Sequence, residues 1–339
     1  MQTMISQDEY RAVREGAAIV DRSGRGRLLL NGGDRRSYLQ GLLTNDIAAL
    51  TAGTGCYAAY LTAQGRMISD MRVFEMGDAI LLDLEGFVAS QVRDRLSQFI
   101  FSEDVEVRDL SEPQAQIGVY GPQAAAVVAE ALSVAAAPTE QAPAVSTLEA
   151  MRMLSSARWD FRGAPVYVLR GDDVGAPGFD LVVDRAHAAE LVPLLRSHGA
   201  IDVQDAVVET TRIEAGRPRF GVDMSDDTIP LEAGIEDRAI SRTKGCYVGQ
   251  EIIIRVLDRG HGRVARRLVG LKLTAATVPA PGDAIRSGQR EIGHVTSAAY
   301  SPLLETPVAL GYVHRDFTEP GTGVDVAGHP ATVAETPFS

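Results

Sequence analysis

Residues 244–251, with the sequence KGCYVGQE, contain one of the two cysteines of this 339-residue chain. A thiol becomes a nucleophile when positive charge or a helix N-terminus stabilises its thiolate form. Arg242 and Lys244 precede Cys246, and the following run GQEIIIRVL can begin a helix, so both conditions can be met here. The alternative is a small buried hydrophobic residue, the usual state of a free cysteine. The charged setting favours a reactive thiol at Cys246, whereas nothing near Cys56 predicts chemistry there.

Several acidic residues lie inside predicted strands and helices rather than in loops. Asp70 falls in the run RMISDMRVF and Asp180 in the run GFDLVVD, both of which read as strands. Glu209 and Glu214 belong to a predicted helix, DAVVETTRIEAG. The alternatives are a surface charge for Asp70, a strand-capping carboxylate for Asp180 and a solvated helix face for both glutamates.

A basic cluster follows the cysteine motif, but the chain as a whole is acidic. The formal net charge of -12 repels a polyanion, so we expect no nucleic acid to wrap around the surface. A solvated surface that balances nearby acids is the simplest interpretation of the cluster, ahead of a local RNA site. Its members are Arg255, Arg259, His261, Arg263, Arg266 and Arg267.

Length and composition predict several packed units without a membrane span. A chain of 339 residues with 45% hydrophobic content exceeds one compact domain, and it has no apolar run of about 20 residues. The first 20 residues mix acids and bases, unlike a secretory signal. The two cysteines form no CxxC pair, so we expect neither a disulfide framework nor a metal site. A cytoplasmic protein is predicted.

The hydrophobic pattern predicts two mixed units followed by an all-β unit. In the first, CYAAYLT and RMISDMRVF form a hairpin across the turn AQG, and a helix with Asp34 at its N-cap covers 34–46. The second contains strands at 164–170 and 178–184 and helices at 185–199 and 205–216. The Ala/Pro/Thr-rich stretch 133–147 reads as a loop. Beyond Gly260 the strands and turns are typical of an all-β module.

Four segments together resemble a known family. RIEAGRPRFGVDM, IPLEAGIE, KGCYVGQEIIIR and IGHVTSAAYSPLLETPVALGYV are similar to the folate-binding family that includes the glycine-cleavage aminomethyltransferase, or T-protein. The complete cysteine motif most resembles its YgfZ branch, which is linked to iron–sulfur cluster maintenance and tRNA modification.

The resemblance spans nearly the whole chain and implies an α+β fold arranged as a ring around a folate channel. It comprises two α+β folate-binding regions of ferredoxin-like or Greek-key type and a C-terminal β-barrel (259–339). The first region covers 1–110, and the second, which includes the cysteine motif, covers 111–258.

The ligand implied by the resemblance is tetrahydrofolate. A carboxylate accepts the adjacent N–H groups of a reduced pterin, and arginine or lysine binds the glutamate tail. Asp70 matches the family's catalytic aspartate, and Asp180 matches a pterin-binding glutamate but is one methylene shorter. We expect a cavity with acids on its wall and the Cys246 sulfur at its edge. The expected catalytic residues are Cys246 and Asp70, and the expected folate-binding residues are Asp70, Asp180, Glu209, Glu214, Arg212 and Lys244.

Three functions remain open. The first is a tetrahydrofolate-binding accessory protein of the YgfZ type, which supports iron–sulfur cluster assembly or repair and iron–sulfur-dependent tRNA modification through Cys246. Its partners would be iron–sulfur enzymes, assembly factors or a tRNA-modifying enzyme, and a cluster would need ligands from a partner. The second is an aminomethyltransferase; the family's transferases have aspartate where this chain has Cys246. The third is an RNA-associated module.

Overall fold

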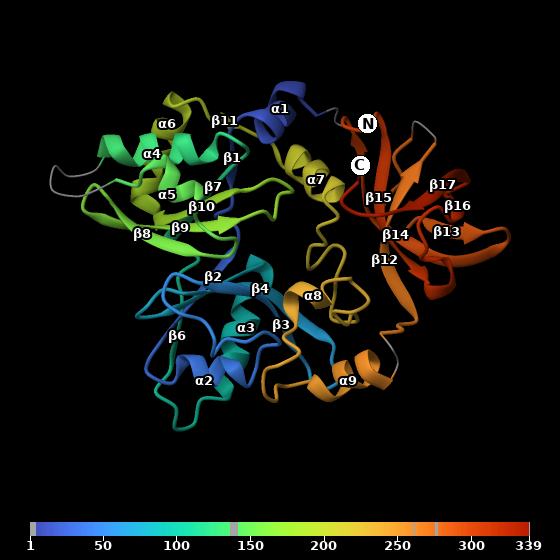
Figure 1. Ribbon diagram of the computed structural model, residues 1–339, viewed down its shortest axis with the longest axis horizontal. Helices are drawn as coiled ribbons and strands as arrows, with labels where there is room; N and C mark the ends of the chain where they lie inside the picture. The colour runs from blue at the N-terminus through green and yellow to red at the C-terminus, as the bar shows by residue number, and fades with distance from the viewer. Residues whose placement is uncertain (1–4, 136–141, 260–261, 275–276, 339) are drawn as a thin grey trace.

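The computed structural model describes residues 5–135, 142–259, 262–274 and 277–338. They form a five-stranded sheet, a six-stranded sheet and a closed barrel, with helices on the outer faces of the two sheets (Figure 1). This arrangement confirms the predicted α+β class with a C-terminal barrel. In the part of the chain that is described, no helix combines the length and the apolar character needed to cross a membrane.

The five-stranded sheet has the order β3-β4-β5-β2-β6. Its β3–β4 hairpin confirms the predicted pairing across the turn AQG. Helix α3 covers the outer face of the sheet with Val88, Val92 and Leu96. The elements are β2 (Gly26–Asn31), α2 (Arg35–Gln40), β3 (Gly55–Leu61), β4 (Met67–Glu75), β5 (Ile80–Leu84), α3 (Gly86–Gln98) and β6 (Glu106–Asp109).

Helix α2 is much shorter than the predicted 34–46. Asp34 is its N-cap residue but makes no side-chain capping bond. Its carboxylate accepts instead from the backbone N–H of Asp104, 2.9 Å away, and so ties the helix start to the loop before β6. The chain leaves the helix at Gly41, because Leu42 and Leu43 are buried in the core beneath the sheet rather than on a helical face.

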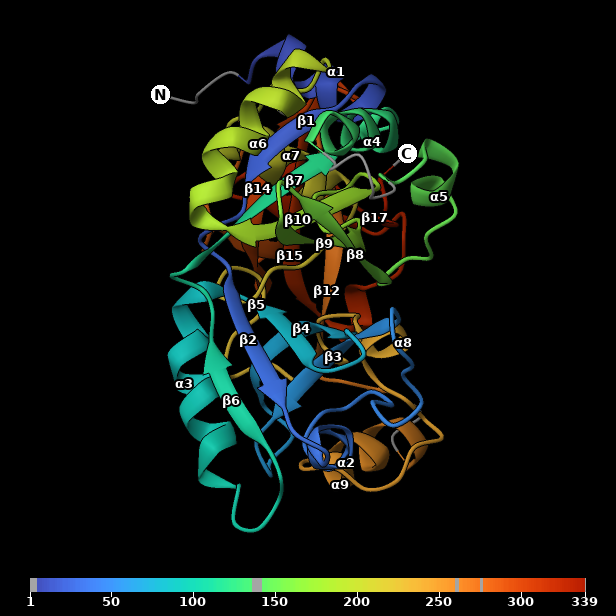
Figure 2. The same cartoon turned by 90° about the vertical axis from the view of Figure 1, so that its left-hand side faces the viewer.

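The six-stranded sheet has the order β11-β1-β7-β10-β9-β8, and α4 and α6 pack on its outer face (Figure 2). The stretch predicted as a loop, 133–147, contains the end of α4 and the start of α5; residues 136–141 lie outside the described residues. The elements are α1 (Gln7–Glu15), β1 (Ala18–Asp21), β7 (Gln114–Tyr120), α4 (Ala124–Ala135), α5 (Val145–Glu149), β8 (Ser156–Phe161), β9 (Ala164–Gly171), β10 (Gly178–Asp184), α6 (Arg185–Ser197) and β11 (Ile201–Asp202).

The hydrogen-bonded sheets depart from the predicted boundaries in two places. Strand β1 lies within the first predicted region but pairs with β7 and β11 of the six-stranded sheet. Conversely, Phe220, Leu231 and Ile253 belong to the core of the five-stranded sheet. Within the described residues the chain therefore passes between the two sheets three times: between β1 and β2, between β6 and β7, and between β11 and the segment that contains Phe220.

The inner faces of the two sheets meet. Phe74 and Leu81 of the first sheet pack against Leu169 and Val182 of the second. Helix α7 (Asp205–Glu214) then runs between the six-stranded sheet and the barrel, as Figure 1 shows. The short helices α8 (Glu236–Ala239) and α9 (Gln250–Ile254), with a π-helical turn at Arg255–Arg259, follow.

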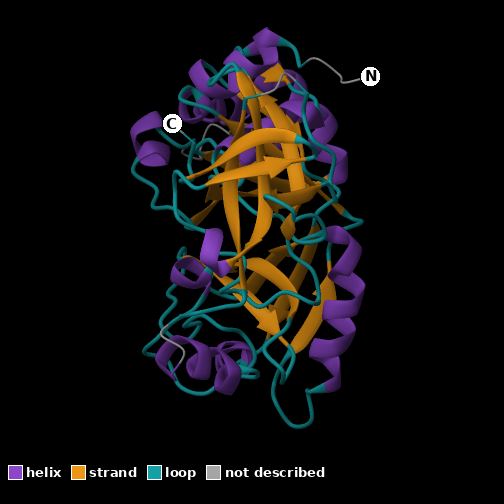
Figure 3. Cartoon of the chain, turned by 90° about the vertical axis from the view of Figure 1, so that its right-hand side faces the viewer, coloured by secondary structure: helices purple, strands orange, loops and turns teal. Residues whose placement is uncertain are grey.

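The C-terminal barrel closes in the order β12-β15-β14-β13-β16-β17. Figure 3 views the molecule from the side on which the barrel lies. It confirms the predicted all-β module, and Gly260, beyond which the strand pattern was predicted, lies outside the described residues. A β-bulge interrupts the pairing of β14 with β15 between Val295 and Ser297. The elements are β12 (Arg266–Leu273), β13 (Ala284–Ser287), β14 (Arg290–Ser301), β15 (Thr306–His314), η2 (Arg315–Phe317), β16 (Gly323–Val326) and β17 (His329–Ala334).

Candidate functional site

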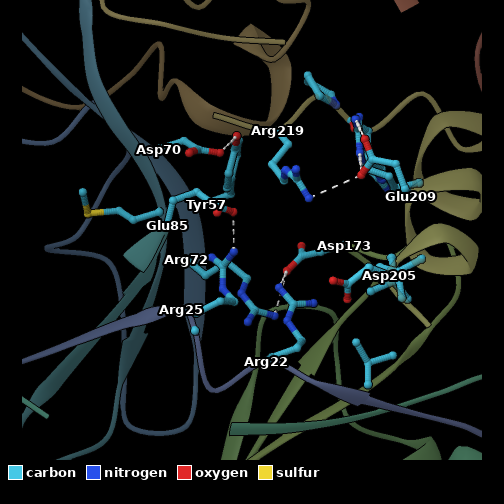
Figure 4. Close-up of a pocket in the computed structure, with 18 of the residues that line it drawn as sticks. Arg22, Arg25, Tyr57, Asp70, Arg72, Glu85, Asp173, Asp205, Glu209 and Arg219 are labelled. Carbon is cyan, nitrogen blue, oxygen red and sulfur yellow. Dashed lines mark hydrogen bonds and ion pairs between the residues drawn. The ribbon is translucent and has the colours of Figure 1, made fainter. Parts of the chain in front are cut away.

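A cleft of about 230 Å³ lies where the five-stranded sheet, the loop after β1, the loop after β9 and helix α7 meet (Figure 4). Arginines and carboxylates alternate around it, so it offers both donors for an anionic group and acceptors for N–H groups. Its charged lining residues are Asp21, Arg22, Arg25, Asp70, Arg72, Glu85, Asp173, Asp205, Glu209, Arg212, Arg217, Arg219 and Arg238.

One wall is the β3–β4 hairpin. Asp70 lies opposite Ala59 and Arg72 lies opposite Tyr57 in the register, so the period of two places Tyr57, Asp70 and Arg72 on one face. The Tyr57 hydroxyl donates to Asp70 Oδ2 at 2.6 Å. Burial raises the pKa of Asp70, and the hydrogen bond from Tyr57 partly opposes that rise. The wall therefore presents a half-buried carboxyl group with one fixed donor.

The upper edge of that wall is fixed by a single amide. The Asn45 side chain donates to the carbonyls of Tyr57, at 2.8 Å, and Arg238, at 3.0 Å. The Arg238 guanidinium lies 4.7 Å from the centre of the Tyr57 ring, in cation–π geometry. An exposed arginine thus stands at the cleft rim directly beside Asp70's partner.

The opposite wall is helix α7 and the segment after it (Figure 4). Arg212 holds Glu209 through two donors, and its Nε lies 2.8 Å from Glu209 Oε2. Arg219 approaches the same carboxylate at 3.3 Å. Burial raises the pKa of Glu209, but the two arginines outweigh burial and the net pKa is lowered. Glu209 is therefore a carboxylate that aligns two arginines along the cleft.

The floor is a buried ionic cluster between the sheets. Arg72 Nη2 lies 2.5 Å from Asp180 Oδ2, and Tyr120 donates to Asp180 Oδ1 at 2.8 Å. Burial raises the pKa of Asp180, but Arg22 and Arg72 more than compensate, so the net pKa is lowered. Asp180 is fully buried and is not among the residues that line the cleft. Asp173, bonded to Arg22 at 3.2 Å, faces the cleft instead.

Two further residues that were predicted to bind folate also lie away from the cleft. Glu214 is buried beside Tyr10 and Arg14 of α1 and accepts from the Ser301 hydroxyl of the barrel at 2.5 Å. The ammonium group of Lys244 donates to three backbone carbonyls at the end of α2 and just after it, at 2.6 to 2.9 Å. Both side chains join parts of the fold, and neither lines the cleft.

The thiol of Cys246 is exposed, and Cys246 is not among the lining residues of the cleft. Helix α9 begins at Gln250, four residues later. In the described part of the chain, no group of three or more His, Cys, Asp or Glu side chains is arranged to hold a metal ion. Asp70 and Cys246 therefore occupy separate surroundings instead of one shared cavity.

The basic cluster is largely engaged with acids or lies outside the described residues. Arg266 lies 3.5 Å from Glu232, and Arg267 lies 2.8 Å from Glu236. His261 lies outside the described residues, as does the side chain of Arg259.

Reasoning from the sequence found Asp70, Glu209 and Arg212 in the cleft but missed most of its arginines. Arg72 could have been predicted from the sequence, because it is two residues from Asp70 on a predicted strand and must lie on the same face. Arg22 and Arg25 lie in a loop distant in sequence, so only the tertiary fold reveals them. The cleft has the character of a site for an anionic, N–H-rich small molecule.

Comparison with known protein families fits this geometry. The GCVT N-terminal domain matches residues 2–244, and the glycine cleavage T-protein C-terminal barrel domain matches residues 266–339. The chain therefore belongs to the glycine cleavage T-protein family.

Similar proteins include the aminomethyltransferase of Nostoc sp. (strain PCC 7120), which is 29% identical over 97% of this chain and 86% of its own length. The aminomethyltransferase of Streptomyces coelicolor is 28% identical over 98% of this chain and 89% of its own length. The glycine cleavage system aminomethyltransferase T from Bartonella henselae superposes with a TM-score of 0.86 at 23% identity, covering 98% of this chain and 89% of that one. That likeness establishes the shared fold.

Proposed function

We propose that this chain binds tetrahydrofolate in the cleft and there accepts a one-carbon group onto a folate nitrogen. The observation that supports this proposal is the distribution of charge: a half-buried carboxyl group on one wall and exposed arginines at the rim. A pterin needs the first, and a glutamate tail needs the second. Membership of the T-protein family supports the same ligand.

The proposal assigns roles to charged side chains of the cleft. Asp70, held by Tyr57, faces the pterin and stabilises the positive charge that develops as the aminomethyl carbon leaves the sulfur of a lipoyl-carrier intermediate for a folate nitrogen. The carrier keeps its thiol, the amino group leaves as ammonia, and the carbon becomes the methylene group of the folate. Arg217, Arg219 and Arg238 bind the tail carboxylates. Glu209 aligns Arg219 and Arg212. The relatives named aminomethyltransferase support this class of reaction.

Two measurements test the proposal in order. Calorimetry with tetrahydrofolate should give saturable binding, and no heat at ligand concentrations near a millimolar would reject the site. A reconstituted glycine-cleavage assay should then give methylene-tetrahydrofolate and ammonia only when this chain is present. Binding without turnover would reject the transferase activity and keep the ligand.

A second candidate function is favoured by the exposed thiol of Cys246 within its complete motif, outside the cleft. It is the YgfZ-type accessory role, in which folate is a bound ligand and Cys246 works on iron–sulfur enzymes, assembly factors or a tRNA-modifying enzyme. Cys246→Ser in a strain lacking this chain should fail to restore iron–sulfur enzyme activity, with Cys56→Ser as the matched control. Equal rescue by both variants would remove this role.

The cytoplasm is the proposed location for either function. Cys56 and Cys246 are both free thiols, a state that a reducing compartment maintains. Fractionation of cells that express the chain tests the location directly, and recovery outside the cytoplasmic fraction would contradict it.

A further inference from the structure

A buried carboxylate joins the barrel to the cleft. Among the described residues that line the cleft, none belongs to the barrel. Asp223, in the segment after α7, is 2% exposed and accepts hydrogen bonds from both sides. It connects the barrel's strand β14 to the arginines of the cleft.

On the barrel side, Asp223 Oδ1 accepts from the hydroxyls of Thr296 at 2.5 Å and Ser297 at 2.7 Å. Neighbouring residues of a regular strand point to opposite faces, so they cannot both reach one atom. The β-bulge between Val295 and Ser297 removes this restriction, because an extra residue re-aims the local side chains. The bulge thus lets two consecutive hydroxyls bind one carboxylate oxygen.

On the cleft side, Asp223 Oδ2 accepts from Arg212 Nη1 at 2.7 Å and from the backbone N–H of Arg219 at 3.0 Å. Arg212 Nη1 also donates to the carbonyl of Arg217 at 2.9 Å. Asp223 therefore holds both ends of the 217–219 segment, directly at Arg219 and through Arg212 at Arg217. The other edge of the Arg212 guanidinium holds Glu209.

We propose that Asp223 is a positioning residue through which the barrel, by way of Thr296 and Ser297, sets the arginines that receive the carboxylate tail of the ligand. This inference rests on the proposed folate function of the cleft. It assigns the barrel a part in ligand affinity without any contact between the barrel and the ligand. Asp223 itself is not among the residues that line the cleft.

The test compares two ligands by calorimetry: tetrahydrofolate, and 6-methyltetrahydropterin, which has the ring but no carboxylate tail. Asp223→Asn should lower the affinity for tetrahydrofolate about tenfold, because one charge-assisted hydrogen bond is lost. It should change the pterin affinity less than about twofold, because Asp70 lies on the other wall. The double variant Thr296→Val, Ser297→Ala should show the same split and serves if Asp223→Asn does not fold.

Thr322→Val is the matched control, since this half-buried threonine just before β16 donates to the carbonyl of Glu319. Its affinities for both ligands should equal those of the parent. Unchanged tetrahydrofolate affinity in both test variants would overturn the inference alone, and equal losses for the two ligands would show a merely structural role and overturn it too. A parent that binds neither ligand would instead reject the proposed function.

Discussion

At the scale of single residues, the carboxyl groups in the cleft and buried beneath it are of two kinds. Glu209 and Asp180 lie against arginines that lower their pKa values, whereas burial raises the pKa of Asp70. Groups with a shifted pKa in a cleft are candidates for function, and of these three carboxyl groups Asp70 is the one bonded to a tyrosine and to no arginine. That contrast favours Asp70 as the acid that meets the ligand.

Asp70→Asn should stabilise the protein while lowering its affinity for the ligand. A raised folded-state pKa means that the neutral carboxyl contributes stability below its ordinary pKa, and this stability is lost as pH rises through the folded value. The amide is neutral at every pH, so the variant should have the higher Tm at about pH 7, and the gap should close toward about pH 4. Tetrahydrofolate affinity should fall about tenfold or more.

The control for that prediction is Asp78→Asn, at an exposed turn between β4 and β5. Thermal melts at both pH values, with calorimetry at neutral pH, give the answer. A variant with the parent's Tm at neutral pH would show that ionising Asp70 costs the fold nothing.

At the scale of elements, the segment that carries the cysteine motif (244–251) is anchored to the five-stranded sheet. Lys244 donates to the carbonyls of Gln40, Leu43 and Asn45, and the Asn45 side chain in turn holds Tyr57. The motif lysine thus satisfies orphan carbonyls around the end of α2.

Lys244→Met should lower the free energy of unfolding by about 2 to 3 kcal/mol, because methionine keeps the apolar stem but leaves buried carbonyls without a donor. Arg242→Met is the matched control. Arg242 is exposed and lies 3.5 Å from Asp237, a pair worth at most about 0.5 kcal/mol. Urea unfolding of both variants measures the difference, and an unchanged midpoint for Lys244→Met would show that the anchor is dispensable.

The sequence predicts features that depend on interactions between residues close together in the chain, and it does not predict those that depend on distant segments. The β3–β4 hairpin has a turn signal and period-two alternation, so Asp70 was placed on its strand correctly, and helical spacing placed Glu209 and Arg212 together on α7. Helix α2 ended early because buried Leu42 and Leu43 overrode local propensity. The pairing of β1 with β7, and hence the approach of Arg22 to the floor, joins segments about 100 residues apart that no local pattern links.

At the scale of the whole molecule, α7 contacts α1, the loop after β9 and the barrel strands β14 and β15. One of its faces lines the cleft through Glu209 and Arg212, while Glu214 at its end binds α1 and the barrel. A residue expected to bind folate thus holds the N-terminal helix, α7 and β14 together. Substitutions at the end of α7 should therefore change stability, whereas substitutions on its cleft face should change ligand affinity.

Glu214→Ala makes that separation measurable. Removing the buried carboxylate leaves Tyr10 and Ser301 without their acceptor and Arg14 without its ion pair, so the free energy of unfolding should fall by about 2 to 3 kcal/mol. Tetrahydrofolate affinity, measured well below the unfolding temperature, should stay within about twofold of the parent because Glu214 does not line the cleft. Glu319→Ala, on the exposed barrel surface, should change neither quantity. A Glu214→Ala variant with parental stability and a large loss of affinity would contradict this arrangement and return Glu214 to the ligand.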